Sequence, residues 1–214
     1  MDDGNSERWY RLRSGFKHGR FIMGRAIGLT NHIEPKGLPD LFKGDLKPIA
    51  PIRIGAFLGT KPGDFVWCDP IPITCISQRV VDCFTRHGIT GWTVYPVELA
   101  DRKGSIVPDY RGLSITGRAG RLVGSRSRLE TREPMVPGGS TWRVYVGMRL
   151  DCSEWDGSDI CVSPSSYEIW CREKVITAVD DCGLTNAEYV RMDQIEWWEA
   201  LFADEDNPPV KWEP

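Results

Sequence analysis

Cys83 and His87 have the residue types and the spacing of a pair of metal ligands. They are four positions apart in a segment with helical spacing, so one face of a helix would carry both side chains. A thiolate and an imidazole bind zinc, but a structural zinc site needs four ligands, and the rest of the chain supplies no second pair with recognisable spacing. We therefore predict neither a metal site nor a cofactor.

The seven cysteines are at positions 68, 75, 83, 152, 161, 171 and 182, and they form no C-x-x-C pair. A secreted disulfide scaffold would have an even number of cysteines in a much shorter chain. We expect reduced, mostly buried thiols that act as small apolar side chains.

The chain has three histidines, His18, His32 and His87. No recognised hydrolase, metalloprotease or kinase motif is present, and His87 is predicted in the last turn of a helix, where the dipole favours a partly charged imidazole. We predict no catalytic residues and no enzymatic activity. An unrecognised hydrolase with a spatially assembled site, using Cys83 and His87 for example, stays open as an alternative.

Two loop segments have compositions that suit ions. The glycines of residues 117–124 would let backbone amides approach a phosphate, but the phosphate-loop spacing is missing and no helix pattern follows. Residues 151–159 are acidic, but the acids do not fit the calcium-loop positions before Gly157, and no glutamate closes the loop. We expect strand connections in the first segment and a turn capped by aspartate side chains in the second.

Opposite charges are concentrated in two segments, although the formal net charge is only −3. Residues 111–132 contain six arginines and one acid, whereas residues 188–206 contain seven acids and one base. The first segment gives an alternative function, the binding of a nucleic acid or a small anion, with Arg118 and Arg121 as the residues to test. A solvated charged face is the usual explanation of such a run, and we do not expect nucleic acid as the partner.

Tandem tryptophans flanked by acids occur near the end of the chain. Aromatic side chains anchor protein interfaces, and acidic side chains steer cationic partners. The alternative is that the aromatic residues pack the chain end onto the core. The predicted partner-binding residues are Trp197, Trp198, Glu199, Asp204, Glu205 and Asp206.

Two copies of one short pattern organise the chain. Residues 79–91 and 174–186 align without a gap, and each copy has an apolar helical stripe, then Gly88 or Gly183 at the expected helix C-cap, then a β-prone segment. Ser77 is the predicted N-cap of the first helix, with its hydroxyl accepting from a backbone N–H. We predict two strand–helix–strand pseudo-repeats, at about residues 73–99 and 167–195.

The remaining pattern predicts strands joined by loops. Strands are expected at 21–27, 52–58, 113–115 and 141–150, and residues 34–51, rich in proline and glycine, are expected to form a long loop. Pro96 lacks an N–H, so the strand at 92–95 is expected at an edge or a bulge. We predict an α+β fold with a largely antiparallel sheet, in a single domain of residues 1–214.

The overall composition is that of an ordinary soluble domain, with 41% hydrophobic and 27% charged residues. No apolar run approaches the ~18 residues needed to span a bilayer. The first residues are acidic and polar, unlike a secretory signal. We expect a cytoplasmic protein that does not associate with a membrane.

Two groups of short motifs lie within about residues 64–195. They are Asp64-Phe65, Ile76-Ser77, Arg79-Val80-Val81, Gly88-Ile89-Thr90-Gly91-Trp92, Tyr95-Pro96-Val97, Trp155-Asp156-Gly157-Ser158-Asp159, Lys174-Val175 and Gly183-Leu184-Thr185-Asn186. Together these motifs resemble a family of small bacterial proteins, the predicted immunity proteins of polymorphic toxin systems. This family includes the myxobacterial double-CxxCG proteins, although the chain lacks the CxxCG motifs themselves. The resemblance implies a non-enzymatic, cytoplasmic protein that binds and neutralises a cognate protein toxin.

Overall fold

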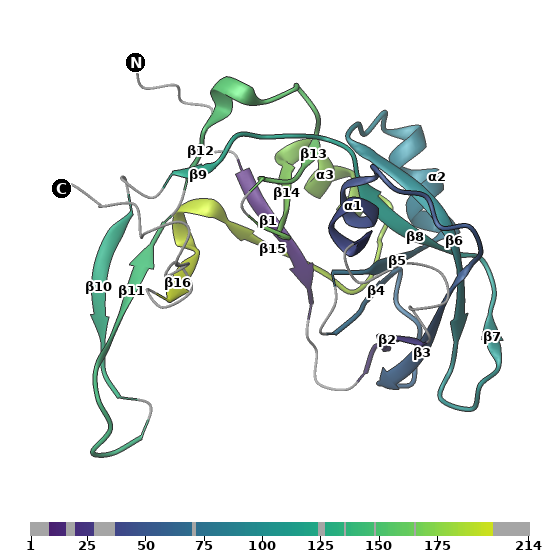
Figure 1. Cartoon of the computed structure of the whole chain (residues 1–214), viewed down its shortest axis with the longest axis horizontal. Helices are drawn as coiled ribbons and strands as arrows, with labels where there is room; N and C mark the ends of the chain where they lie inside the picture. Colours follow the sequence, from purple (N-terminus) through teal and green to yellow (C-terminus); the bar gives the residue numbers. More distant parts are fainter. Residues whose placement is uncertain are drawn as a thin grey trace.

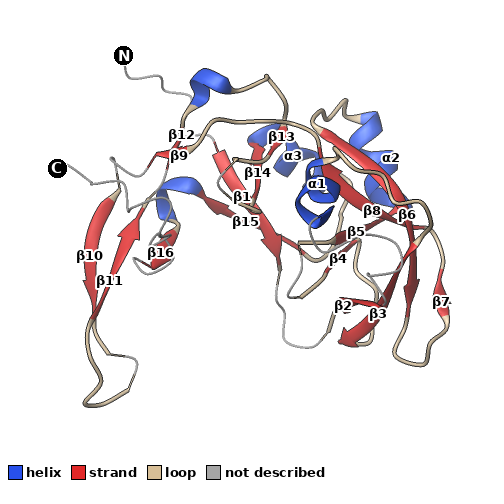
Figure 2. Ribbon diagram, in the orientation of Figure 1, coloured by secondary structure: helices blue, strands red, loops and turns tan. Residues whose placement is uncertain are grey.

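The protein consists mostly of β-strands, in antiparallel and mixed sheets, with few helices (Figure 1, Figure 2). The structure is a computed structural model that describes residues 9–15, 20–27, 37–69, 72–123, 127–134, 136–147, 149–164 and 166–198. The helices are α1 (Leu38–Lys43), α2 (Gln78–Arg86) and α3 (Glu173–Asp181), with the 3-10 helices η4 (Cys152–Glu154) and η5 (Met192–Gln194). The strands are β1 (Trp9–Ser14), β2 (Met23–Ile27), β3 (Ile52–Leu58), β4 (Phe65–Trp67), β5 (Thr74–Ser77), β6 (Trp92–Ala100), β7 (Ile106–Val107), β8 (Tyr110–Ile115), β9 (Leu122–Val123), β10 (Arg128–Arg132), β11 (Trp142–Val146), β12 (Arg149–Leu150), β13 (Ile160–Cys161), β14 (Ile169–Arg172), β15 (Ala187–Arg191) and β16 (Glu196–Trp198).

The largest sheet has seven strands, in the order β2-β3-β6-β8-β5-β4, with β7 paired to β6. Its pairings are antiparallel except for β3 with β6. Strand β6 changes partner at Pro96: residues 92–96 pair with β8, and pairing with β3 begins at Val97. Strand β6 is therefore longer than the predicted 92–95. It continues through Pro96 because this residue, which lacks an N–H, lies where the hydrogen-bonding partner changes from β8 to β3.

A four-stranded sheet, in the order β13-β14-β1-β15, joins the first described strand to the C-terminal part of the chain. Strand β1 lies between β14 and β15 and is antiparallel to both. Strand β8 has the same place between β5 and β6 in the larger sheet. We name β4-β5-β8-β6 with α2 the first unit, and β13-β14-β1-β15 with α3 the second unit.

The two units have corresponding strand orders and antiparallel pairing. Helices α2 and α3 have nine residues each, whereas β6 has nine residues and β15 has five. The offset of 95 residues that relates α2 to α3 also separates two residues that are in contact. Cys83 lies against Ala178, 95 residues further along the chain. Each helix ends in a left-handed glycine, Gly88 with a φ of 58° and Gly183 with a φ of 57°. The predicted left-handed glycines are therefore confirmed, each one position after the C-cap residue, His87 in α2 and Cys182 in α3.

The two helices pack against each other and share one core. Each buries residues at the same three positions of its apolar stripe, as a helix with one core-facing side requires. The cluster that they form also includes Phe65, Leu113 and Ile160 from the sheets. The buried helix residues are Val80, Cys83 and Phe84 in α2, and Val175, Ala178 and Val179 in α3.

Three predicted elements differ in the structure. The proline-rich segment contains α1, which has a proline in its first turn and ends at the left-handed Gly44, so these residues begin and end a short helix. Ser77 occupies the N-cap position of α2 but makes no capping hydrogen bond, because its hydroxyl donates to Asp64. The strand predicted at 141–150 is interrupted at Gly147, which has a φ of 79°.

A third sheet, β10-β11-β16, projects from the two units, and we name it the projecting sheet (Figure 1). Strand β11 is antiparallel to both neighbours, so β10 and β16 form its two edges. The hydrogen bond from Gly147 N to Ile195 O, 2.9 Å long, ties its base to the segment that follows η5. Among the described residues, no helix is long and apolar enough to cross a membrane.

Candidate functional site

A buried carboxylate joins the two units on one side of the helix pair. Asp64 is 5% exposed and accepts hydrogen bonds from the Ser77 hydroxyl at 2.8 Å and from Arg79 Nη1 at 2.9 Å. It also accepts from both the backbone N–H and the hydroxyl of Thr185, at 2.9 and 2.8 Å. Arg79 continues to the carbonyl oxygen of Cys182 at 3.0 Å. We name this set the Asp64 cluster.

The second unit has the same arrangement around Asp159. Its Oδ2 accepts from the N–H and the hydroxyl of Thr90, at 2.9 and 3.1 Å, and from Lys174 Nζ at 2.9 Å. Lys174 also donates to the carbonyl oxygen of Gly88 at 2.8 Å. In this Asp159 cluster, as in the Asp64 cluster, a carboxylate of one unit holds the threonine that follows the helix of the other. Two of the aligned residue pairs, Arg79 with Lys174 and Thr90 with Thr185, therefore make hydrogen bonds between the units.

Tyr110 closes the buried side of the Asp64 cluster. Its hydroxyl donates to the carbonyl oxygen of Gly63 at 2.7 Å. Burial, and then the negative charge of Asp64, raise the pKa of Tyr110 to about 12. The unfolded chain ionises at the ordinary tyrosine pKa of about 10. Tyr110 therefore contributes stability that is fully present below about pH 10 and is lost as the pH rises through about 12.

We expect Tyr110→Phe to reduce the loss of unfolding free energy between about pH 10 and about pH 12, because phenylalanine has no proton to release. Urea unfolding at a series of alkaline pH values measures this loss. Tyr167→Phe is the control, since Tyr167 is 54% exposed. An alkaline slope that is the same in Tyr110→Phe and in the unsubstituted protein would contradict the assignment.

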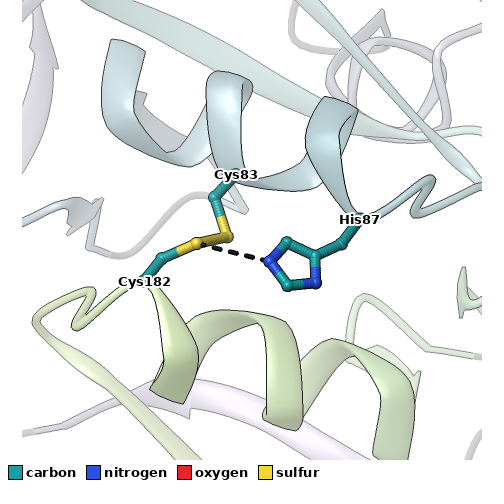
Figure 3. A group of neighbouring side chains, drawn as sticks. All are labelled: Cys83, His87 and Cys182. Atoms are coloured by element: carbon teal, nitrogen blue, oxygen red, sulfur yellow. Dashed lines mark hydrogen bonds between the residues drawn. A yellow bond between two sulfur atoms is a disulfide. The ribbon is translucent and has the colours of Figure 1, made fainter.

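Cys83, His87 and Cys182 meet between α2 and α3, which lie side by side with their C-terminal ends at opposite ends of the pair (Figure 3). Their ligand atoms all lie within 4.8 Å of one another, and His87 Nε2 lies 3.8 Å from Cys182 Sγ. Cys83 is buried, whereas His87 and Cys182 are half-buried. Cys182 has the position in the second unit that corresponds to His87 in the first unit. It joins the predicted pair, Cys83 and His87, as the third residue of the cluster.

The structure corrects the expectation that all thiols are reduced. Cys83 and Cys182 form a disulfide between the two units, with their Cα atoms 6.3 Å apart. Cys68, Cys75, Cys161 and Cys171 have free thiols. Burial raises the pKa of the Cys161 and Cys171 thiols, which keeps them neutral and matches the expected role of small apolar side chains.

The two loop segments have the structural roles expected for them. A Cβ at Gly117 would lie 2.0 Å from Ile160 O, and one at Gly120 would lie 2.1 Å from Asp151 O, so these glycines permit close contacts between backbones. In the acidic turn, Asp151 accepts from Ser153 N at 2.9 Å and Asp156 accepts from Ser158 N at 3.0 Å. The pKa of the Asp151 carboxyl is lowered by the Ser153 hydroxyl and then by the Ser153 N–H. Burial opposes the shift at Asp156, but the hydroxyl and N–H of Ser158 still lower the pKa of its carboxyl.

The arginine-rich segment is divided among different parts of the fold. Arg111 lies in β8, whereas Arg128 and Arg132 lie in β10. Arg118 donates to the carbonyl oxygens of Ile115 and Lys43, at 2.8 and 2.9 Å, and pairs with Asp45 at 3.1 Å. A test of anion binding should therefore use the exposed Arg121, since replacing Arg118 removes structural contacts.

A pocket of about 290 Å³ lies beside the second unit. Arg20 and Lys61 line it, together with Gly15, Phe21 and residues 184–187. The lining as described contains no histidine, cysteine or carboxylate, so the pocket does not include the Cys83–His87 pair of the hydrolase alternative. His18 and His32 lie outside the described residues.

The structure places the backbone of two predicted partner-binding residues at the edge of the projecting sheet. Trp197 pairs with Tyr145, and Trp198 pairs with Val144, both through β11. Arg132 of β10 bridges Glu130 and Glu196, at 2.6 and 2.5 Å, and its hydrogen bond lowers the pKa of Glu130. The backbone of the tandem tryptophans is thus part of the projecting sheet. Glu199, Asp204, Glu205 and Asp206 lie outside the described residues.

Comparison of the chain with models of known protein families gives no match, and comparison with curated proteins also gives none. The geometry of this chain therefore carries the functional argument.

Proposed function

We propose that this chain is a non-enzymatic cytoplasmic binder that neutralises a cognate protein toxin, the function that its sequence motifs imply. The observation that carries the proposal is the projecting sheet. One of its edges is β16, which contains the tandem tryptophans and leads directly into the acidic end of the chain. Among the described strands, none pairs with the outer side of β16. A strand edge of this kind accepts an extended segment of a partner by adding a strand to the sheet.

The two units have a structural role that is consistent with recognition by the projecting sheet. We propose that the two units are pseudo-repeats within one α+β domain, and that their shared residues hold them together. Asp64, Asp159, Thr90 and Thr185 all bond across the boundary between the units. This use leaves recognition to segments that the two units do not share, and the projecting sheet is one of them.

Charge identifies the chemistry of the partner. Seven acids and one base occur in residues 188–206, and a cationic protein is the complement of that segment. On the other edge of the projecting sheet, Leu129 is 46% exposed and adds apolar contact area. We propose a basic protein partner that covers one edge of this sheet and contacts the acidic segment.

The test is binding to the product of the gene next to this one. We expect Trp197→Ala combined with Trp198→Ala to weaken binding by roughly 700-fold, since buried aromatic anchors contribute about 2 kcal/mol each. A chain that ends at residue 198 should bind more slowly, and the difference should disappear at high salt. Isothermal titration and stopped-flow mixing measure the two effects.

Tyr167→Ala is the matched control, because it removes an exposed aromatic side chain from a segment outside the projecting sheet. The second readout is protection of cells that express the neighbouring gene. If the chain does not protect them, or if the double tryptophan variant and the control bind with equal affinity, the proposal is wrong.

A further inference from the structure

The donor atoms of Cys83, His87 and Cys182 form a set that suits a thiophilic metal ion (Figure 3). Two sulfurs and one imidazole nitrogen are a common donor set for zinc, with sulfur at about 2.3 Å and nitrogen at about 2.0–2.1 Å from the metal. Donors at those distances in tetrahedral geometry are roughly 3.5–3.8 Å apart. His87 Nε2 is already 3.8 Å from Cys182 Sγ, so the imidazole needs no large movement to become a ligand.

The surroundings of these three residues favour a cation. His87 and Cys182 are the C-cap residues of α2 and α3, where the helix dipoles place partial negative charge, whereas Cys83 lies within α2. The carboxylates of Asp180 and Asp181 lie in the last turn of α3, and Arg86 lies in the last turn of α2. The nearby cations Arg79 and Lys174 are already paired with Asp64 and Asp159.

We propose that reduction of the Cys83–Cys182 disulfide converts this cluster into a zinc site with Cys83, His87 and Cys182 as ligands. A dithiol supplies two electrons and two protons, the S–S bond breaks, and the dithiol becomes a cyclic disulfide while two protein thiols form. Zn²⁺ then displaces both thiol protons and binds the two thiolates and the neutral imidazole. Water completes the tetrahedron at the half-buried side of the site.

In both states the same residues join α2 to α3, by a covalent bond when oxidised and by a shared metal ion when reduced. The cytosol keeps most protein thiols reduced, so the zinc form is the one that operates in the cytoplasmic location proposed above. The inference does not depend on the proposed partner. Zinc binding is measured on the isolated protein, so its failure is distinguishable from failure to bind a toxin.

The experiment titrates the full-length protein with Zn²⁺ in competition with a chromophoric chelator, before and after reduction by a dithiol that is then removed under anaerobic conditions. We expect one Zn²⁺ per chain in the reduced protein and none in the oxidised protein. Co²⁺ should reproduce the stoichiometry and give the intense absorption of tetrahedral thiolate coordination. Equal uptake by the two forms, or no uptake by the reduced form, would overturn the proposal.

Variants assign the ligands. Cys182→Ser should abolish the thiolate–Co²⁺ absorption of a two-sulfur site, and His87→Gln should weaken Zn²⁺ binding by about 100-fold or more, because loss of an outer-shell partner alone weakens it 10–100-fold. Cys68→Ser is the matched control, since Cys68 is a free thiol outside the cluster and next to Cys75. His87→Gln keeps both cysteines and therefore tests the site without removing the cross-link. If the control loses zinc and Cys182→Ser keeps it, the assignment is wrong.

Discussion

Gly91→Ala is expected to lower the free energy of unfolding by about 4 kcal/mol. Gly91 has a φ of 88°, and a Cβ at this position would lie 2.0 Å from the carbonyl oxygen of Ile160. A left-handed conformation costs an alanine roughly 1–2 kcal/mol, and an overpacked contact costs roughly 1–3 kcal/mol more. The oxygen belongs to the backbone of β13, so no side-chain rotation relieves the contact.

Gly88→Ala is the matched control for this substitution. Gly88 lies in the same turn and also has a positive φ, of 58°, but no atom lies within 4 Å of the Cβ that an alanine would add. We expect a loss of only about 1 kcal/mol, from backbone strain alone. Urea unfolding of both variants measures the difference, and equal losses would show that the approach of the second unit to Gly91 is not tight.

The Gly91 result also reports on the boundary between the two units. Ile160 N donates to Thr90 O at 3.1 Å, directly beside the position where the methyl group would be added. The substitution therefore pushes β13 away from the turn that follows α2. Because this boundary includes the Asp159 cluster, hydrogen exchange in the variant should rise at Thr90 and Ile160 before it rises in β2 and β3.

The second large effect is expected at the Asp64 cluster. Asp64→Ala should lower the free energy of unfolding by about 3 kcal/mol, because it leaves the Ser77 hydroxyl and the Thr185 N–H without their acceptor in a buried position. The Arg79 side chain is 60% exposed and returns to water, so the loss stays at the lower end of the range for a broken buried pair.

Asp159→Ala is the control, since it removes the same group from the second unit. The Asp159 side chain is 17% exposed, whereas that of Asp64 is 6% exposed. Water can accept some of the hydrogen bonds that the Asp159 carboxylate accepts. We therefore expect Asp159→Ala to lower the free energy of unfolding by about 1–2 kcal/mol. Chemical unfolding with both variants compares the two clusters. A loss in Asp159→Ala that matches or exceeds the loss in Asp64→Ala would contradict the burial argument.

Local patterns predicted the elements that depend on neighbouring residues. The apolar stripes and the two glycines predicted helices α2 and α3 and their C-terminal ends, since these follow from spacing within one or two turns. Helix α1 was missed because its six residues carry a proline and end at a glycine, which together resemble a loop. The strand at 141–150 was predicted too long because alternation persists across the turn at Gly147.

The candidate sites were predicted only in part. Cys83 and His87 were identified because four-residue spacing on a helix is visible in the sequence, but Cys182 joins them from the end of another helix, 99 residues after Cys83. Asp64 and Asp159 were missed as a pair, although the offset that aligns the two segments also separates these two residues. The offset shared by Arg79 and Lys174, and by Thr90 and Thr185, is the signal that could have found them.

The sequence by itself determined the periodic helices, most of the strands and the left-handed glycine ends, because each depends on residues that are close along the chain. Only the tertiary structure decided that β1 lies between β14 and β15, that the carboxylate of each unit holds the threonine of the other, and that Cys182 meets Cys83 and His87. The physical reason is that pairing across such separations is selected by burial and hydrogen bonding in the assembled core. Local spacing carries no information about which distant segment meets that demand.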